Sequence, residues 1–228
     1  MKNPVIISLG GSLIVPDGID TAFLSEFKKL IEDEVKQEKS FVIVTGGGKI
    51  CRRYQAAGKE IAGFSQTEID WIGIYVLRLN AEFVRMLFGS LAHERVVIQP
   101  SELESVTKPV VLCGAEAPGH STDFDAVEMA AQVGATKIVN LSNIDFVYDK
   151  DPKRYLDAVK IARISWSAFR KIIPEKWAPG LNSPFDPIAA ARAQELGLEV
   201  AIMNGKPLTH LADYLAGKSF VGTVISPK

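Results

Sequence analysis

Hydrophobic positions along the chain follow two patterns: short unbroken runs, and longer stretches in which apolar residues recur every three or four positions. Unbroken runs rich in Val and Ile are typical of strands buried on both faces, and the longer spacing indicates helices that cover them. Strands are predicted at residues 5–9, 41–44, 96–98, 110–112, 137–141, 200–203 and 223–225. Helices are predicted at residues 23–35 after an Asp20 N-cap, and at 49–62, 68–88, 122–133, 165–172, 187–196 and 208–216. This alternation predicts an α/β fold with a mainly parallel, helix-covered sheet.

Some stretches refine this pattern. Residues 148–163 are polar and rich in turn formers, and prolines within and beside residues 177–184 exclude regular structure there. No internal repeat, low-complexity segment or linker separates the elements, so residues 1–228 are predicted to form a single domain. The helix at 68–88 carries six large apolar residues on one side, namely Ile69, Ile72, Val76, Leu79, Phe83 and Met86.

The composition mainly excludes certain classes of protein function. The hydrophobic fraction of 47% suffices for a sizeable core, and 26 Lys and Arg residues nearly balance 27 Asp and Glu residues. This balance argues against nucleic-acid binding through a broad basic surface, but it allows a small anion held by local cations. We expect neither a secretion signal nor a membrane helix, which needs ~20 consecutive apolar residues. Cys51 and Cys113 fall in apolar patterns, so we expect buried free thiols and a reducing, cytoplasmic compartment.

Two glycine-rich turns follow neighbouring strands, Gly10-Gly11-Ser12 and Gly46-Gly47-Gly48-Lys49. Successive backbone N–H groups in such a turn, followed by a helix N-terminus, form an anion site. A tight turn that needs glycine only for its backbone explains either turn equally well by itself. The two turns together, one with an adjoining lysine, favour phosphate binding.

Two further polar segments follow later strands. Within residues 113–123, Ser121, Thr122 and Asp123 place three oxygen-bearing side chains at one helix start, where ordinary capping needs one. Hydroxyl and amide donors that meet an oxyanion explain this surplus better. Within residues 140–152, Tyr148 would lie against a nucleobase and an aspartate would accept from a ribose hydroxyl; a solvated turn is the alternative.

Several common motifs are missing. The chain has no Gly-x-x-x-x-Gly-Lys-Ser/Thr sequence, and Cys51 stands where a dinucleotide fingerprint needs glycine. His93, His120 and His210 lie too far apart to indicate a zinc site, and no Ser-x-Gly elbow indicates a hydrolase. No metal site formed by side chains is predicted.

Taken together, the motifs resemble those of the amino acid kinase superfamily and, within it, the archaeal-type uridylate (UMP) kinases. The segment at residues 118–123 is similar to that group's Pro-Gly-His-Thr-Thr-Asp, and residues 143–148 are similar to its Asn-Val-Asp-Gly-Val-Tyr. The resemblance runs nearly end to end and rests on Leu9-Gly10-Gly11-Ser12, Val44-Thr45-Gly46-Gly47-Gly48-Lys49 with Arg52, Asp70-Trp71-Ile72-Gly73-Ile74 with Arg78, Asn80 and Ala81, Pro118-Gly119-His120-Ser121-Thr122-Asp123, Asn143-Ile144-Asp145-Phe146-Val147-Tyr148 with Asp151-Pro152, Asp186-Pro187, and Gly222-Thr223.

The resemblance implies a three-layer αβα sandwich, the reaction ATP + UMP → ADP + UDP with Mg²⁺, and a homo-oligomer, typically a hexamer built as a trimer of dimers. We expect the helix at 68–88 to pair with its copy. ATP would contact Gly11, Ser12, Gly48, Arg52, Ser142, Tyr148 and Asp151. UMP would contact Gly47, Asp70, Glu116, Ala117, Pro118, Gly119, His120, Ser121 and Thr122.

This chemistry suits the residue types. Phosphoryl transfer asks a protein mainly to align two phosphates and to neutralise the charge between them. Because the acceptor is already an oxyanion, no strong general base is required. Gly47 and Gly48 would donate backbone N–H groups, and Lys49 and Arg52 would be the catalytic cations, with Arg52 on the transferred group.

Three departures from the superfamily pattern leave alternatives open. Ser8 replaces the usual lysine, as in archaeal uridylate kinases, which favours them over acetylglutamate, glutamate and isopentenyl phosphate kinases. Phe146 replaces a glycine beside the adenine pocket, and the turn at residues 113–117 brings Glu116, whose carboxylate would repel phosphates. A related kinase with another phosphate or carboxylate acceptor is one alternative. The other is an ATP- or oxyanion-binding storage protein similar to molybdenum storage proteins.

Overall fold

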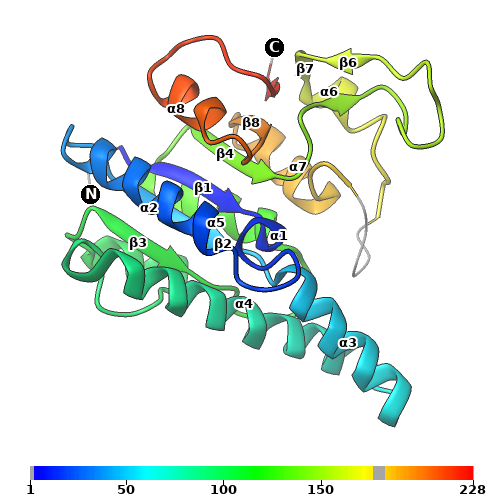
Figure 1. Cartoon of the computed structure of the whole chain (residues 1–228). Helices are drawn as coiled ribbons and strands as arrows, with labels where there is room; N and C mark the ends of the chain where they lie inside the picture. The colour runs from blue at the N-terminus through cyan, green and yellow to red at the C-terminus, as the bar shows by residue number, and fades with distance from the viewer. Residues whose placement is uncertain (1–2, 177–182, 228) are drawn as a thin grey trace.

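The computed structural model describes residues 3–176 and 183–227, and a seven-stranded sheet forms its centre. The strand order is β3-β2-β1-β4-β8-β9-β7 (Figure 1). The first five strands in that order run parallel, β9 is antiparallel to β8, and β7 is parallel to β9. The strands are β1 (Val5–Leu9), β2 (Phe41–Thr45), β3 (Val110–Cys113), β4 (Lys137–Ser142), β7 (Arg163–Ser165), β8 (Glu199–Asn204) and β9 (Thr223–Ser226). This mainly parallel sheet confirms the predicted fold class.

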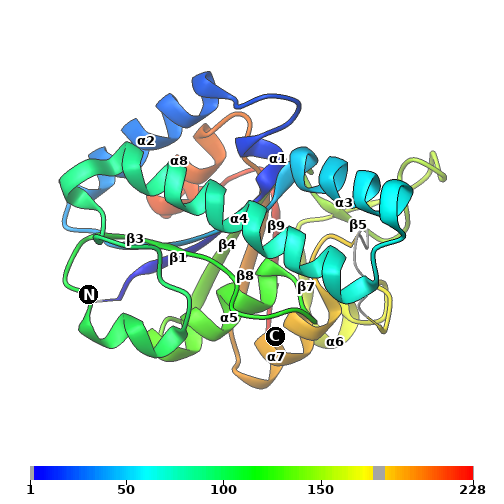
Figure 2. The same cartoon turned by 90° about the horizontal axis from the view of Figure 1, so that it is seen from below.

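Helices cover both faces of the sheet and complete three layers (Figure 2). Alternate strand residues face opposite layers: Ile7 belongs to one buried cluster and Ile6 to the other. The Ile7 layer contains α1 (Gly11–Ile14), α2 (Thr21–Val35), α4 (Gln66–Phe88) and α8 (Thr209–Leu215). The Ile6 layer contains the 3-10 helix η2 (Pro100–Ser105), α5 (Thr122–Val133), α6 (Trp166–Phe169) and α7 (Pro187–Glu195). Helix α3 (Gly48–Ala62) packs on α4 and points away from the sheet (Figure 1), and a short 3-10 helix, η1 (Gly89–Leu91), follows α4.

The predicted strand at residues 96–98 is wrong. Only Val97 pairs with β3, through an isolated bridge to Cys113. The next two backbone N–H groups, those of Ile98 and Gln99, donate to the Glu102 carboxylate at 3.1 and 2.9 Å. Because a side chain satisfies these donors, the segment turns into η2 instead of extending the sheet.

The turn-rich segment at 148–163 contains more regular structure than its composition predicts. Strands β5 (Val147–Tyr148) and β6 (Lys160–Ile161) form a separate antiparallel pair, and β7 begins at its end. The predicted helix at 165–172 is shorter, because only Trp166–Phe169 is helical. Residues 177–182 of the predicted proline-rich loop lie outside the described residues. No helix in the described parts of the chain is long and apolar enough to cross a membrane.

The predicted apolar side of α4 is buried only in part. Ile69 and Val76 are buried, whereas Leu79 and Met86 are 68% and 61% exposed, and the helix also buries Leu77, Ala81 and Val84. Apolar residues occur on most of the helix surface, so spacing alone did not distinguish the core side from the exposed side. The exposed stripe also includes Trp71 and Tyr75, whose rings lie 5.9 Å apart.

Candidate active site

The two predicted glycine turns lie against each other at the carboxyl ends of β1 and β2. A Cβ added to Gly11 would lie 2.1 Å from the Gly48 nitrogen and 2.5 Å from the Gly46 oxygen. Gly48 has a φ of +71°, and a Cβ there would lie 2.4 Å from the Gly11 oxygen. Side chains are excluded at both positions because backbone meets backbone. The pairing therefore explains these glycines structurally, and it places the start of α3, whose Lys49 nitrogen donates to the Val15 oxygen at 3.2 Å, beside the first turn.

Helix α4 holds the second glycine turn through a buried asparagine. The Asn80 side-chain amide donates to the Gly46 oxygen at 2.9 Å and to the Gly47 oxygen at 3.3 Å. The Thr45 hydroxyl, just before the turn, donates to the Leu77 oxygen at 3.0 Å. Through these contacts, α4, the helix that also carries Asp70, holds the turn in its orientation. Asn80 was named only as part of a family pattern, and its helical position gave no signal of this role.

Asp70 lies near the start of α4, and its carboxylate accepts from the Gln66 amide at 3.0 Å. The same part of α4 approaches the second glycine turn: a Cβ added to Gly47 would lie 3.9 Å from the Gly73 oxygen. Gly73 is one helical turn beyond Asp70, so the fold brings the Asp70 region close to Gly47.

The third turn, which follows β3, is held by Arg78. The Arg78 guanidinium donates to the Ala115 oxygen at 2.9 and 3.1 Å and to the Glu116 oxygen at 3.2 Å. The Glu116 carboxylate accepts from the Gln99 amide at 2.9 Å. Its negative charge is therefore engaged with Gln99 next to the start of η2. Ala117 and Gly119 are exposed, and Pro118 and His120 are partly buried.

Ser121 ends this turn and caps α5, and its hydroxyl accepts from the Asp123 nitrogen at 3.2 Å. Of the three predicted polar side chains, only Ser121 is the cap. Asp123 instead accepts from the Ser8 hydroxyl at 3.0 Å, from the Asn140 amide at 2.8 Å and from the Asp186 nitrogen at 3.2 Å. It thus ties β1, β4 and the start of α7 together beneath the glycine turns.

Asp123, Asp125 and Asp186 form a cluster that we call the aspartate cluster. Burial raises the pKa of Asp123 to about 6, although the hydrogen bonds from Ser8 and the Asp186 nitrogen oppose the shift. Burial and repulsion by Asp123 and Glu116 raise the pKa of Asp125 to about 8. In the described residues, one oxygen of Asp125 and one of Asp186 are buried without a hydrogen-bond partner. Asp125 therefore retains a proton near neutral pH.

The predicted cations extend from α3 at the same edge. Lys49 forms a 2.5 Å ion pair with Asp17, and Arg53 pairs with the same carboxylate at 3.2 Å. Arg52 is exposed, and no ion pair holds it within the described residues. Arg52 is therefore the cation most free to meet an incoming anion, whereas Lys49 must first leave Asp17. Asp17 was not predicted, because it lies in a loop without a motif.

Lys206 is a cation at this edge that the sequence reasoning missed. It follows β8 directly after Gly205, whose nitrogen donates to the Ser142 oxygen at 2.9 Å. Its ammonium pairs with Asp20 and lies 5.7 Å from the Phe23 ring centroid. The glycine-lysine pair at a strand end, which it shares with Gly48-Lys49, was the available signal.

The fourth predicted segment divides in two. Ser142 lies beside the first turn, because a Cβ added to Gly10 would be 3.5 Å from the Ser142 Cα. Tyr148 lies farther on in β5, and Asp151 accepts from the Lys153 nitrogen at 2.9 Å within its own turn. No hydrogen bond or ion pair in the described residues joins Tyr148 or Asp151 to the glycine turns. Phe146, the other departure in this segment, lies under the Lys160 ammonium at 5.1 Å.

Both cysteines are buried free thiols, as predicted. Burial raises the pKa of each thiol, and Cys51 lies directly behind the second turn, because a Cβ added to Gly47 would be 2.7 Å from its Cβ. The described residues contain no group of three His, Cys, Asp or Glu residues that is placed to hold a metal ion.

Comparison with known proteins gives one consistent group. The model of the amino acid kinase family matches residues 3–204. The uridylate kinase of Archaeoglobus fulgidus is 35% identical over 225 residues, which cover 97% of this chain and 99% of that protein. The uridylate kinase of Thermococcus kodakarensis is 33% identical over 230 residues, with 98% and 99% covered. The crystal structure of the A. fulgidus uridylate kinase matches with a TM-score of 0.83 at 34% identity, and covers 99% of this chain and 100% of that one.

Proposed function

Since the chain belongs to the amino acid kinase family, we propose that it is a uridylate kinase that transfers the γ-phosphoryl group of ATP to UMP and yields ADP and UDP. One observation carries the proposal: similarity to archaeal uridylate kinases over nearly the whole chain. The paired glycine turns, the Arg78-held turn and Ser142 supply an oxyanion-binding edge that suits this reaction.

In the proposed site, the paired glycine turns align the two phosphates. Backbone N–H groups at Gly11, Ser12 and Gly48 face the donor, and Gly47 lies on the acceptor side. Arg52, which has no ion pair in the described residues, neutralises charge on the transferred group, and Lys49 assists after exchanging Asp17 for phosphate. The acceptor oxygen needs no general base, because the phosphate of UMP is already ionised.

The remaining contacts follow the family pattern. Residues 116–122 and Asp70 hold the UMP phosphate, base and ribose, while Ser142, Tyr148 and Asp151 contact ATP. The Glu116 carboxylate, which accepts from Gln99, does not prevent this arrangement, because that hydrogen bond directs it to the start of η2. For Tyr148 and Asp151, the proposal requires the β5–β6 hairpin to border the adenine or ribose.

Mg²⁺ fits this site as an ion carried by the nucleotide. Mg²⁺ commonly binds substrate phosphates with only one or two carboxylates and keeps several waters. The described residues offer no three-ligand protein site, and Asp125 of the nearby aspartate cluster, with a pKa raised to about 8 by burial, retains a proton near neutral pH. When bound, the ion would neutralise charge on the ATP phosphates.

A homo-oligomer is proposed through the exposed stripe of α4, defined by Trp71, Tyr75, Leu79 and Met86. Leu79, Tyr75 and Met86 are each more than 60% exposed, and a second copy of the helix would cover them. The proposal that the oligomer is a hexamer, built as a trimer of dimers, rests on the resemblance to the family. Light scattering tests this arrangement: Leu79→Glu should reduce the mass of the particle, and an unchanged mass would refute pairing through this stripe.

The decisive experiment for the activity is a nucleotide panel. The purified protein is incubated with Mg-ATP and UMP, CMP, AMP or GMP, and ADP formation is followed. We expect UMP-dependent ADP and UDP in equal amounts. ADP formed only with another acceptor would assign a related kinase, and ATP binding without any acceptor-dependent ADP would favour the storage-protein alternative.

A further inference from the structure

A large cavity lies where the parallel strands begin, at the end of the sheet opposite the glycine turns. It has a volume of about 600 Å³ and borders the first residues of β1, β4 and β8, namely Val5, Lys137 and Glu199. The first glycine turn follows the other end of β1, a distance of roughly 15 Å for a five-residue strand, and the second turn lies against the first. The cavity is therefore separate from the proposed kinase site.

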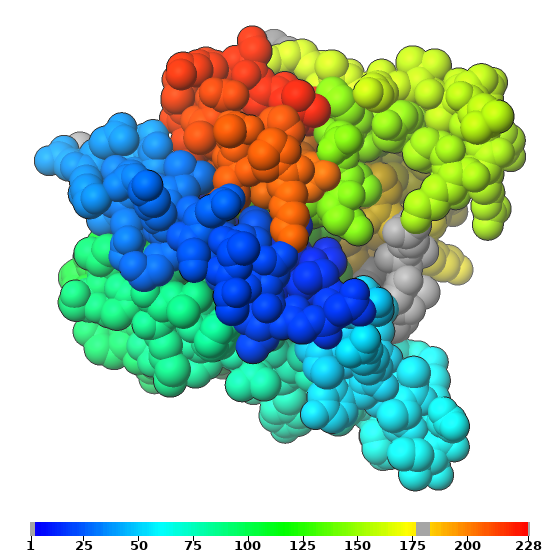
Figure 3. Space-filling model, in the orientation of Figure 1, coloured from blue at the N-terminus to red at the C-terminus, as the bar shows by residue number. Residues whose placement is uncertain are grey.

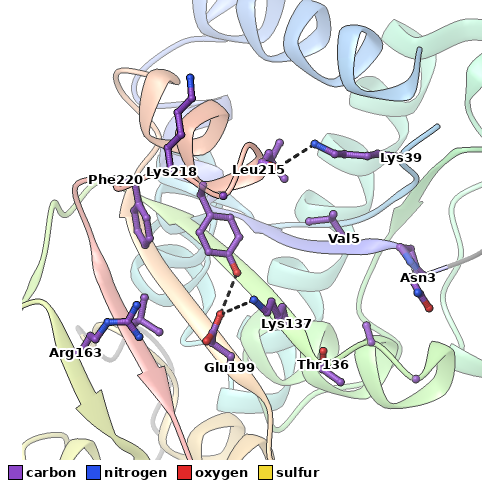
Figure 4. A pocket seen from close by; sticks show the side chains of 16 residues that line it. Asn3, Val5, Lys39, Thr136, Lys137, Arg163, Glu199, Leu215, Lys218 and Phe220 are labelled. Carbon is purple, nitrogen blue, oxygen red and sulfur yellow. Dashed lines mark hydrogen bonds and ion pairs between the residues drawn. The ribbon is translucent and has the colours of Figure 1, made fainter. Parts of the chain in front are cut away.

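The strand register explains why polar side chains collect in this cavity. Lys137 is paired with Glu199, and Arg163 is paired with Val224, which pairs in turn with Ala201. Because side chains alternate along a strand, these positions all project toward the same face, the face that α8 covers. Helix α8 ends at Leu215, and the loop that carries Lys218 and Phe220 continues over the sheet beyond it (Figure 4).

The cavity is strongly cationic for this chain. Its lining includes Lys39, Lys137, Arg163 and Lys218 against one carboxylate, Glu199, although the whole chain has a net charge of −1. An ion pair between a cation and a carboxylate of this lining is neutral, so the other cations keep the lining positively charged. Local positive charge of this kind attracts anions.

Two of these cations already have partners. Lys137 pairs with Glu199 at 3.4 Å, and the Tyr214 hydroxyl donates to the same carboxylate at 3.4 Å. Lys39 pairs with Glu34 and donates to the Leu215 oxygen at 3.0 Å. These contacts neutralise Glu199, so its charge does not cancel that of the remaining cations.

Arg163 and Lys218 remain available. Both are exposed, and neither side chain forms an ion pair or hydrogen bond within the described residues. Figure 4 shows Arg163 on β7 at one side of the cavity and Lys218 on the loop above it, with the Lys218 side chain pointing away from the cavity. An anion in the cavity would give Arg163 a partner directly, and Lys218 a partner once its exposed side chain turns inward.

The cavity also has an apolar wall. Phe220 lies edge-on to Tyr214 with ring centroids 5.2 Å apart, and Leu215 and Val5 continue the apolar surface. A bare inorganic ion would leave this wall and most of the volume unused. Volumes of about 300–1,000 Å³ with mixed apolar and polar linings suit organic ligands.

We propose that this cavity binds a small phosphorylated organic molecule with a planar ring, whose phosphate meets Arg163, and Lys218 once that side chain turns inward, and whose ring covers Phe220. This inference does not depend on the kinase activity, because it rests on a cavity at the other end of the strands.

The test compares Arg163→Gln/Lys218→Gln with the unaltered protein, using inorganic pyrophosphate and UTP as probes in calorimetric titrations. Hydrogen exchange with and without UTP then locates the binding. We expect UTP to protect residues 215–224 in the unaltered protein, and the double variant to lose this protection and to bind at least about tenfold more weakly at this site. Pyrophosphate should bind more weakly than UTP, because it lacks a ring.

The matched control is Lys29→Gln/Lys171→Gln, which removes two exposed cations elsewhere and changes the net charge equally. We expect it to retain protection of residues 215–224. Equal losses in both double variants would reveal only nonspecific attraction and overturn the proposal. Unchanged protection in the Arg163/Lys218 variant would also overturn it, and equal affinities for the two probes would refute an organic ligand.

Discussion

The glycine turns and the β5–β6 hairpin enter the proposed site in different ways. At the turns, backbone touches backbone, and a Cβ on Gly11 would lie 2.1 Å from the Gly48 nitrogen. In the hairpin, Tyr148 belongs to a two-stranded sheet of its own, and Asp151 serves its own turn. The turns are thus a preformed part of the sheet edge, whereas in the proposed site the hairpin would contribute through side chains. Substitutions that disturb packing should therefore have large effects on activity and stability at the turns and small effects in the hairpin.

The most disruptive test of this contrast is Gly11→Ala. We expect it to abolish turnover and to lower the free energy of unfolding by about 3 kcal/mol, because a methyl group cannot fit between the two turns without moving backbone. Urea unfolding and the ADP assay measure both effects. Gly18→Ala is the control, since nothing lies within 4 Å of a Cβ there. Equal behaviour of the two variants would show that the turns are not tightly packed.

Arg52→Ala should separate chemistry from packing. We expect turnover to fall about 100-fold, because the transferred group loses its main cation. Stability should change by less than about 0.5 kcal/mol, because the side chain is exposed. Arg53→Ala, which removes only an exposed ion pair with Asp17, should retain most of the activity. A rate for Arg52→Ala that equals the unaltered rate would remove Arg52 from the site.

The aspartate cluster beneath the turns should make stability depend on pH. The pKa of Asp125 is about 8 in the folded chain against 3.8 for an ordinary aspartate, so the folded protein retains a proton that the unfolded chain releases. The free energy of unfolding should therefore fall as pH rises from about 4 to 8, by up to about 1.4 kcal/mol per pH unit. Between about 4 and 6, Asp123 adds to the fall, since its own pKa is about 6.

Asp125→Asn should flatten this slope, because an amide keeps the neutral form at every pH. Urea unfolding at pH 5, 6, 7 and 8 measures it. Asp33→Asn should leave the slope over this range unchanged, since pairing with Lys36 lowers the pKa of Asp33 below its usual value. A slope for Asp125→Asn as steep as that of the unaltered protein would contradict the assignment.

The hairpin should show the smallest effect. Tyr148→Ala should raise KM for ATP about fivefold and leave stability nearly unchanged, because one stacking contact is worth about 1 kcal/mol. Tyr155→Ala, at an exposed tyrosine of the same segment, should leave KM unchanged. If Tyr148→Ala lowers turnover as strongly as Arg52→Ala, the hairpin is as integral to the site as the glycine turns.

By itself, the sequence determined six of the seven strands of the central sheet and its glycine turns, because buried parallel strands need unbroken apolar runs and close backbone approach needs glycine. The motif order also determined the family. The strand prediction at residues 96–98 was wrong because the nearby Glu102 carboxylate accepts from backbone N–H groups that a strand would need.

Only the tertiary structure decided which side of α4 is buried, because apolar residues surround much of that helix. It also decided that Asp123 joins Ser8 and Asn140 instead of simply capping α5, and that Lys206 lies at the site edge. The cationic cavity is another such result. Its residues come from seven separate parts of the chain, and strand register and the end of α8 bring them together.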